Sequence, residues 1–538
     1  MKKEKKLKFV THQLELLGQK QFSMSDYCFA VETFPRCSYE QLREYLVLPS
    51  KTKVQGIVAS VDRDKVLERS FEKMERPQQR NVMLLVDEVQ IRPTLAFSGG
   101  ILGGMAQNNP ECRATHMLAI MMKSLHRGPS VMISVTPVHK LTAAFQFNVV
   151  REAAAAVEKA GGRVIGSITD NHRINQQYCK LFGKQGDCPA TATHPLDERR
   201  VWFLVYDTVH LLKCIRNNWL TERTLRLSLD KENVASFSDV RDLYNAEKDS
   251  VLKTTTLTHA AVYPTRLQLQ NVQHVLKVFD VKVVAALRLR GCKETACFIE
   301  TVLHWWNMVN VSAKGQDQRL CDPHRAVQEP SSTGLNTYLQ VFQNAESGHG
   351  VSRIQCLTHD TKKALVQTMA GLIGVCRYLF ASQFDYVLLR EIQSDRLEGE
   401  FAVYRQSTGA NSFMTSGDVF AECRKRLARH AASYLQSLEL HEDQQKHTCL
   451  GYDLQLEDAA SMETCLSQTL TVNEEASAAY VAGWLERKSE GDLTFSEEEP
   501  MVTGEMKDFI DNVSRSSLKV PHVVTFDFVR LEQYCFFP

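Results

Sequence analysis

The alternation of apolar and polar positions divides the chain into segments of different character. From about residue 81, short apolar runs bounded by polar residues alternate with helix-like stretches. The runs NVMLLVDE, SVMISVTP, VIGSITD and VWFLVYD predict strands, whereas NVVREAAAAVEKAGGR and TVHLLKCIRNNWL predict helices. Strands followed by helices indicate an α/β sheet.

The segments on either side of this region lack the strand pattern. Residues from about 226 to 380 are helix-like, as in KETACFIETVLHWWNMVNV and TKKALVQTMAGLIGVCRYLF, which indicates a helical insertion or second domain. Near the N-terminus, short helices broken at Pro35 and Pro49 fit a helix-turn-helix module or a generic helical subdomain equally well. Beyond about residue 440 the chain is acidic and loosely patterned.

Composition narrows the class of protein. The 538 residues are 43% hydrophobic and 24% charged, as in soluble globular proteins, and the net charge of +1 neither requires nor excludes a nucleic-acid partner. No apolar run approaches the roughly 18 residues of a transmembrane helix, and the start MKKEKKLKF lacks the apolar core of a signal peptide. Fifteen cysteines without a CxxC pair indicate reduced thiols. We therefore expect an intracellular protein that is not bound to a membrane.

Three predicted strands end in an aspartate. Asp87 and Asp170 follow apolar runs, and side chains at the carboxyl edge of parallel strands project into the crevice where α/β proteins place their chemistry. A buried carboxylate is costly without a partner or a metal, although capping of the following turn is the simpler explanation for each. Asp207 directly precedes a predicted helix, so N-capping is its simplest role.

A further acidic group lies in the stretch QSDRLEGEFAVYRQ. Asp395 and Glu398 fall one turn apart on one face of the predicted helix, whereas Leu397 and Phe401 mark its buried face. A solvated helix face is the simplest explanation of the two acids. Glu400 points about 160° away from Glu398 on an ideal helix, so Glu398 is the better partner for Asp395.

The order of these motifs resembles that in the ribonuclease-H-like catalytic domain of cut-and-paste DNA transposases. Their residues resemble the motifs of the P-element transposases and their THAP-domain relatives. LLVDEVQIRP and SITDNHRINQQYCKLFG resemble that family's first and second aspartate segments. YDTVHLLKCIRNNW resembles its Asp-x-x-His-Leu-x-Lys-x-x-Arg-Asn motif, and QSDRLEGEFAVYRQ resembles the helix that supplies its last catalytic acid. The four motifs occur in the family's order within residues 20 to 430.

The resemblance implies an α/β ribonuclease-H-like domain interrupted by an all-helical insertion domain and preceded by a small helical helix-turn-helix domain. Together with the hydrophobic pattern it predicts six parts. These are a basic tail (1–20), a helix-turn-helix-like domain (21–75), the first part of the ribonuclease-H-like domain (78–225), an insertion of the GTP-binding type (226–380), the last ribonuclease-H-like helices (381–440) and a C-terminal appendage (441–538).

The resemblance also assigns chemistry to the acids. Asp87, Asp170 and Glu398 would form a DDE triad that binds Mg²⁺ or Mn²⁺, with Asp395 and Asp207 as supporting residues. Oxygen ligands suit these hard cations, which activate water or a DNA 3′-hydroxyl and stabilise the leaving oxygen. The expected reactions are strand cleavage at a transposon end and transfer of the 3′-hydroxyl into target DNA.

Partners follow from the same resemblance. The predicted DNA contacts are the cations that flank the acids in sequence, Lys213, Arg216 and Arg405. A homo-oligomer that holds two DNA ends and a nuclear location are also expected.

In this family the insertion binds a guanine nucleotide, and the corresponding motif falls on HWWNMVN. Trp306 takes the aromatic position, Asn307 replaces an Asp, and Asn310 matches an Asn. An Asn amide places donors where guanine needs acceptors, which argues against guanine specificity. The alternative is that this run is simply a core helix, since aromatic residues at helical spacing usually pack.

One departure from the family keeps a second function open. Residues 1 to 80 contain only Cys28 and Cys37 and no Cys and His set with zinc spacing, so no THAP zinc module is recognisable there. A domesticated or truncated transposase-derived protein that binds DNA or protein without catalysis is the alternative to an active transposase. A hydrolase or nucleotide-binding protein of another family is disfavoured, because the chain has no GxSxG, GxGxxG or P-loop motif.

Overall fold

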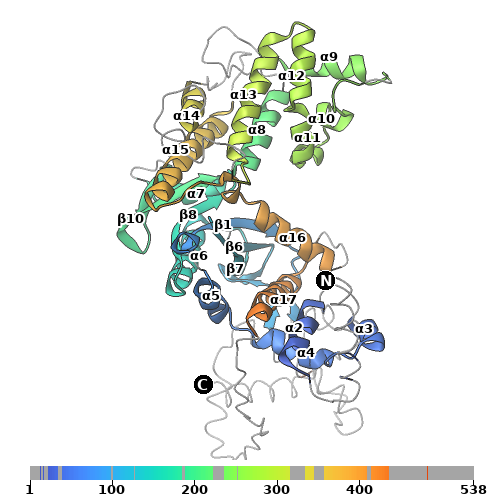
Figure 1. Ribbon diagram of the computed structural model, residues 1–538, viewed down its shortest axis with the longest axis vertical. Coiled ribbons are helices and arrows are strands. Elements are labelled where there is room, and N and C mark those ends of the chain that lie inside the picture. The colour runs from blue at the N-terminus through green and yellow to red at the C-terminus, as the bar shows by residue number, and fades with distance from the viewer. Residues whose placement is uncertain are drawn as a thin grey trace, which may run out of the picture.

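The structure is a computed structural model of the chain (Figure 1). It describes residues 22–435 except 34–38, 75, 99–100, 127, 184–187, 222–234, 251–252, 315–333, 345–356 and 409–412, together with Gln13, Leu16 and Ala482. The predicted appendage at 441–538 and the basic tail at 1–20 therefore lie outside the described residues, except for those last three.

A six-stranded mixed sheet forms the centre of the molecule. The order across the sheet is β7 (Ser130–Val138), β6 (His116–Ser124), β1 (Asn81–Gln90), β8 (Arg163–Thr169), β10 (Asp197–Tyr206) and β9 (Thr191–His194). Strands β1, β8 and β10 are mutually parallel, whereas β6, β7 and β9 each run antiparallel to their neighbours. The four apolar runs of the sequence pattern are thus strands of one sheet, as predicted.

Strand register determines which side chains share a face of this sheet. Met83, Gly166 and Phe203 lie in register on one face, and their chain neighbours Leu84, Ser167 and Leu204 lie on the other. Because the pattern alternates, Asp87 projects on the same face as Met83, and Glu88 projects on the face of Leu84.

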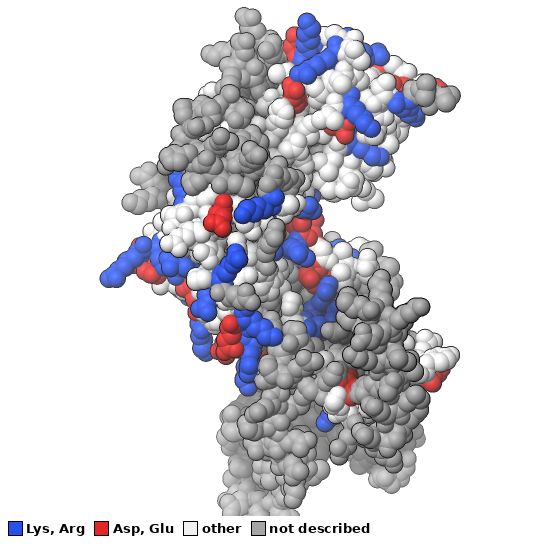
Figure 2. All heavy atoms as spheres, in the orientation of Figure 1, with Lys and Arg blue, Asp and Glu red and all other residues white. Residues whose placement is uncertain are grey.

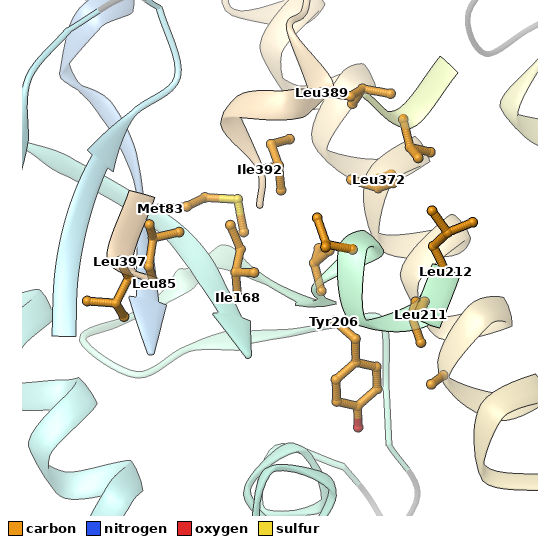
Figure 3. Packing of buried hydrophobic residues seen from close by; sticks show 14 of the residues in the cluster. Met83, Leu85, Ile168, Tyr206, Leu211, Leu212, Leu372, Leu389, Ile392 and Leu397 are labelled. Carbon is orange, nitrogen blue, oxygen red and sulfur yellow. The ribbon is translucent and has the colours of Figure 1, made fainter. Parts of the chain in front are cut away.

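Helices cover both faces. Helix α6 (Ala143–Lys159), capped by Thr142, packs on β1, β6, β7 and β8 and contacts α7 (Arg173–Lys180). On the Met83 face, Leu397 of α16 (Asp395–Ser407) lies beside Met83, Leu85 and Ile168 (Figure 3). Helix α17 (Ser416–Leu435) packs against β7 and the hairpin of β2 (Ala96–Ser98) and β3 (Ile101–Gly103).

Helix α15 (His359–Ala381) lies along β10 (Figure 1). It is long and apolar enough to cross a membrane by length and composition alone, yet much of it is buried against the sheet. Gly371 and Gly374 permit this close approach, because a Cβ atom at Gly374 would stand 2.7 Å from the ring of Phe203. The predicted insertion (226–380) includes most of this helix, which packs against both β10 and α14, so the predicted boundary at residue 380 remains a prediction.

A helical lobe lies beyond α8 (Thr208–Leu220), at the top of Figure 1. Its described residues form helices and no extended strand, which agrees with the helical pattern of the sequence. Trp219 of α8 packs edge-on against the rings of Phe237 and Phe298, from two lobe helices, with centroids 5.0 and 4.5 Å away. The helices are α9 (Phe237–Glu247), α10 (His259–Val262), α11 (Val272–Val278), α12 (Val281–Leu289), α13 (Lys293–Val309) and α14 (Leu335–Asn344), with a 3₁₀ turn at Gln268–Gln270.

The N-terminal region is helical, as predicted, and it packs on the other end of the described chain. Its helices are α2 (Met24–Thr33), α3 (Tyr39–Tyr45), α4 (Lys51–Ser60) and α5 (Arg63–Glu72). Ala30, Val31, Val54 and Val58 form a small core that is completed by Ala428 of α17. The remaining short elements are β4 (Met105–Ala106), β5 (Asn109–Arg113) and 3₁₀ turns at Pro77–Arg80 and Leu389–Glu391.

The close contact between β8 and β10 predicts that position 166 requires glycine. A Cβ atom at Gly166 would stand 2.2 Å from the carbonyl oxygen of Phe203, so Gly166→Ala should lower the free energy of unfolding by about 2–3 kcal/mol. Gly56, in helix α4, has no atom within 4 Å of that position, so Gly56→Ala should raise it by about 0.5 kcal/mol. Urea denaturation of both variants tests this, and equal effects would contradict the described packing.

Candidate active site

Asp87 lies near the end of β1, on the sheet face that α16 covers. Its Oδ1 accepts a hydrogen bond from the backbone N–H of Glu88 at 2.8 Å. Burial raises the pKa of Asp87 to about 7, and the nearby charge of Asp170 adds to the rise. The backbone donor and His210 act in the opposite direction, and Glu398 raises the pKa slightly further. The charges of both other members of the predicted triad therefore influence the pKa of Asp87.

Asp170 directly follows β8, the parallel neighbour of β1. Its Oδ1 accepts hydrogen bonds from the backbone N–H of His172 at 2.8 Å and from Nδ2 of Asn175 at 2.6 Å. Both partners belong to the start of α7, so the first turn of that helix orients the carboxylate. The pairing of β1 with β8 brings Asp170 to the same edge of the sheet as Asp87.

Glu398 lies in the first turn of α16, far along the chain from the two aspartates. Its Oε1 lies 3.1 Å from Nε2 of His210, and this hydrogen bond is the main cause of a lowered pKa for Glu398. Glu400 points elsewhere and pairs with Arg426 of α17 at 2.8 Å. Asp395 lies 3.8 Å from Arg390 but stays near the site, because burial and then the charges of Asp207 and Glu398 raise its pKa. The choice of Glu398 over Glu400 thus agrees with the direction of the side chains.

Asp207 is fully buried and joins three elements. Its carboxylate caps α8 by accepting from the backbone N–H of Val209 and His210, and it also accepts from Oγ of Ser394 at 2.9 Å. Its own N–H donates to the carbonyl of Thr169, next to Asp170, at 2.8 Å. Asp207 is therefore the helix cap that the sequence predicts and a support for α16 as well.

His210 is the residue that sequence reasoning missed as part of the site. The Asp-x-x-His spacing of its motif was the available signal, because it places His210 one turn after the capping aspartate. Burial alone would lower the pKa of His210, but the hydrogen bond to Glu398 and the charges of Asp207 and Asp170 outweigh burial and raise it. Ligand atoms of Asp207, His210 and Glu398 lie within 4.8 Å of one another.

The three residues predicted to contact DNA differ in how deeply they are buried. Arg216 is fully buried and donates to the carbonyl of Leu269 at 3.1 Å, so the predicted phosphate contact of Arg216 is wrong. Its guanidinium holds α8 to the helical lobe instead. Lys213 is mostly buried with its charge near Glu398, and Arg405 is half-buried; both remain predictions. On the face in Figure 2, cationic and acidic side chains are interspersed, which agrees with the near-zero net charge.

The predicted nucleotide motif lies at the end of α13. Trp306 is only 7% exposed, so its ring is unavailable for stacking on a base, and the core-helix interpretation holds for this residue. Asn307 is exposed and Asn310 is the half-buried C-cap of the helix. No described contact tests a nucleotide role for these two residues, and that role remains a prediction.

Comparison with known proteins agrees with this geometry. Residues 64–183, from α5 through α7, match the family model described as the TNP-like, RNase H N-terminal domain, and this stretch contains Asp87 and Asp170. This part of the chain is therefore similar to an RNase H domain of the transposase type. The search of curated proteins finds no match.

A solved structure extends the likeness along the chain. The Drosophila P element transposase strand transfer complex has a similar fold, with a TM-score of 0.65 and 16% sequence identity over 81% of this chain and 99% of the other. The resemblance to P-element transposases that the motifs predicted is thus confirmed at the level of the fold, which is RNase-H-like.

The residue types of the predicted triad suit a hard divalent cation, although its three members are not a group whose ligand atoms all lie within 4.8 Å of one another, as Asp207, His210 and Glu398 are. Asp87, Asp170 and Glu398 supply carboxylate oxygens, and the mutual influence of their charges is what a cation would relieve. Asp207 is less suited to this role, because its oxygens already accept from backbone and hydroxyl donors.

The raised pKa of Asp87 predicts a pH-dependent cost to stability. Between about pH 4 and 7 the unfolded chain releases this proton while the folded protein keeps it, so the free energy of unfolding falls as pH rises. Without divalent cations, Asp87→Asn should therefore be more stable than wild type at pH 8 by on the order of 2 kcal/mol.

Thermal melts from pH 5 to pH 8 test this expectation. The advantage of Asp87→Asn should shrink toward pH 5, where the wild-type carboxyl is protonated in the folded protein. A difference that stays constant across this range would contradict the raised pKa.

Proposed function

We propose that this protein is a DNA transposase of the P-element type that cleaves and transfers DNA strands with a DDE triad of Asp87, Asp170 and Glu398. The observation that supports this most is the convergence of the three acids from β1, β8 and α16. Each carboxylate has its own positioning partner: Glu88 N–H for Asp87, Asn175 for Asp170 and His210 for Glu398. Such preorganisation is typical of a catalytic site.

The three carboxylates would hold Mg²⁺ or Mn²⁺. A divalent cation, when bound, activates the attacking water or 3′-hydroxyl and stabilises the leaving oxygen. With its pKa raised to about 7, Asp87 is partly protonated near neutral pH, and a bound cation would favour release of that proton. The hydrogen bond from Asn175 leaves Asp170 with free lone pairs, because a carboxylate has about four acceptor positions.

DNA is the proposed substrate and partner, both as transposon ends and as target. The related solved structure is named as a transposase strand transfer complex, which supports this proposal. We extend it to a nuclear location and a homo-oligomer that holds two ends. A guanine nucleotide in the helical lobe has weaker support, because Trp306 is buried and Asn307 replaces an Asp.

The alternative is a transposase-derived protein that binds DNA or another protein without catalysis. The same catalytic test separates the two functions.

Metal-dependent nicking of labelled duplex DNA tests the proposed function. Wild type should nick with Mg²⁺ or Mn²⁺, and Glu398→Gln should reduce nicking by at least about 100-fold because a ligand charge is lost. Glu400→Gln is the matched control, since Glu400 is two residues away and pairs with Arg426. Equal losses in the two variants, or wild-type nicking that does not need a cation, would reject the triad.

His210 predicts a smaller and distinct effect. Because His210 positions Glu398 without belonging to the proposed triad, His210→Ala should lower nicking about 10- to 100-fold. The metal concentration for half-maximal activity should rise, and His210→Gln, which keeps a donor, should recover part of the loss. Titration of Mn²⁺ in the nicking assay measures both effects. Unchanged metal dependence in His210→Ala would show that the contact has no positioning role.

A further inference from the structure

A cavity of about 410 Å³ adjoins the two catalytic aspartates. Asp87 and Asp170 form part of its wall, and Glu88 and Gln90 extend it along the opposite face of β1. This volume falls within the range of about 300–1,000 Å³ that is typical of ligand sites. The proposed function uses only the carboxylate edge of the cavity and leaves its interior unexplained.

The interior combines aliphatic walls with a few polar groups. Leu118, Leu141 and Ile174 supply apolar surface, and Thr115 and His116 add polar atoms. Burial and the neighbouring His139 lower the pKa of His116, so its ring is neutral at pH 7. Flat apolar faces with polar edges are the surface of a nucleobase, which enzymes bind between apolar side chains and hydrogen-bonding groups.

Lys140 stands at this cavity in a strained backbone conformation. Its φ angle is 49°, in the left-handed region that favours glycine, and its side chain is exposed. Asn108 holds the loop there, because its Nδ2 donates to the carbonyl of His139 at 2.7 Å and its Oδ1 accepts from the N–H of His139 at 2.9 Å. These two hydrogen bonds hold the loop that carries Lys140, so its cationic side chain lies beside the cavity, where it can contact a phosphate.

A line of hydrogen bonds runs from the cavity wall to a catalytic acid. Asp170 as a carboxylate only accepts, so Asn175 must donate to it, and Oδ1 of Asn175 must then accept from Nε2 of Gln146 at 2.7 Å. Gln146 lines the cavity, is 1% exposed, and its Oε1 has no hydrogen-bond partner among the described residues. This acceptor is available for an N–H donor, such as the amino group of a base.

We propose that the cavity receives one nucleotide of the DNA strand, flanking the cleaved phosphodiester and turned out of the base stack, with Lys140 on its phosphate. This inference rests on the proposed function. The adjoining carboxylates would act on the phosphate next to the held nucleotide, so the cavity would determine which bond is presented to them. Unstacking costs energy that the apolar walls and Lys140 offset.

Fluorescence of 2-aminopurine tests the inference, because stacking quenches it. The positions nicked by the wild-type protein are first mapped on a labelled duplex, which is then synthesised with 2-aminopurine at each position in turn around the nick. On binding to the Asp87→Asn protein, one position next to the nick should brighten several-fold. Adding Ile174→Trp, which fills the cavity from a half-buried position, should abolish this signal. Adding Gln273→Ala, at an exposed position of α11 in the helical lobe, should leave it intact.

Lys140→Gly gives a second test that does not depend on tolerance of a bulky residue. Glycine suits the φ angle of this position, so the variant should melt no lower than wild type. Its affinity for the same duplex should fall, and the slope of log affinity against log salt should decrease by about one, as expected for one lost phosphate contact.

The outcomes of these experiments distinguish failure of the cavity inference from failure of the proposed function. Nicking without any brightened base, a signal that persists in the Ile174→Trp protein, or an unchanged salt slope in Lys140→Gly would overturn the inference alone. Absence of metal-dependent nicking by the wild type would overturn the proposed function, and this inference with it.

Discussion

The buried residue Asp207 joins α8, the start of α16 and the end of β8, the elements around the candidate active site. A buried charge is tolerated only when its lone pairs are satisfied, and here the donors come from α8 and from Ser394 at the start of α16. The backbone N–H of the same residue is bound to the end of β8. Asp207 therefore holds α16, which carries Glu398, in position relative to the end of β8, which Asp170 follows. Around it, Gln393 donates to Thr208 and to the carbonyl of Val309, which ties the same junction to the helical lobe.

This arrangement explains how a distant residue reaches a site on the sheet. Glu398 follows the helical lobe in sequence, so its position depends on where the chain returns from that lobe. The return is fixed by apolar packing of Leu389, Ile392 and Leu397 (Figure 3) and by the polar contacts around Asp207. Packing determines that α16 lies on the sheet, and the directional hydrogen bonds determine where along the sheet its first turn lies.

Sequence patterns were sufficient where local chemistry determines the structure. The apolar runs before Asp87 and Asp170 predicted strands, and the position of Asp207 before a helical run predicted its capping role. Patterns failed where tertiary packing decides. Nothing local distinguishes the buried Arg216 from a surface cation, since its helix is covered by α15 on one side and by helices of the lobe on another. The packing of α15 along β10 could not be predicted for the same reason, because it depends on Gly371 and Gly374. The contact between His210 and Glu398 joins residues 188 positions apart, which periodicity cannot detect.

The small core of the N-terminal helices has a consequence for how the protein is made. Ala30, Val31, Val54 and Val58 are synthesised early, but Ala428, which closes their core, is among the last described residues to leave the ribosome. The apolar face of these helices therefore stays uncovered during most of translation, and contacts of such long sequence separation form slowly. Docking of α17 is therefore a late step for these helices, since their core cannot close before it.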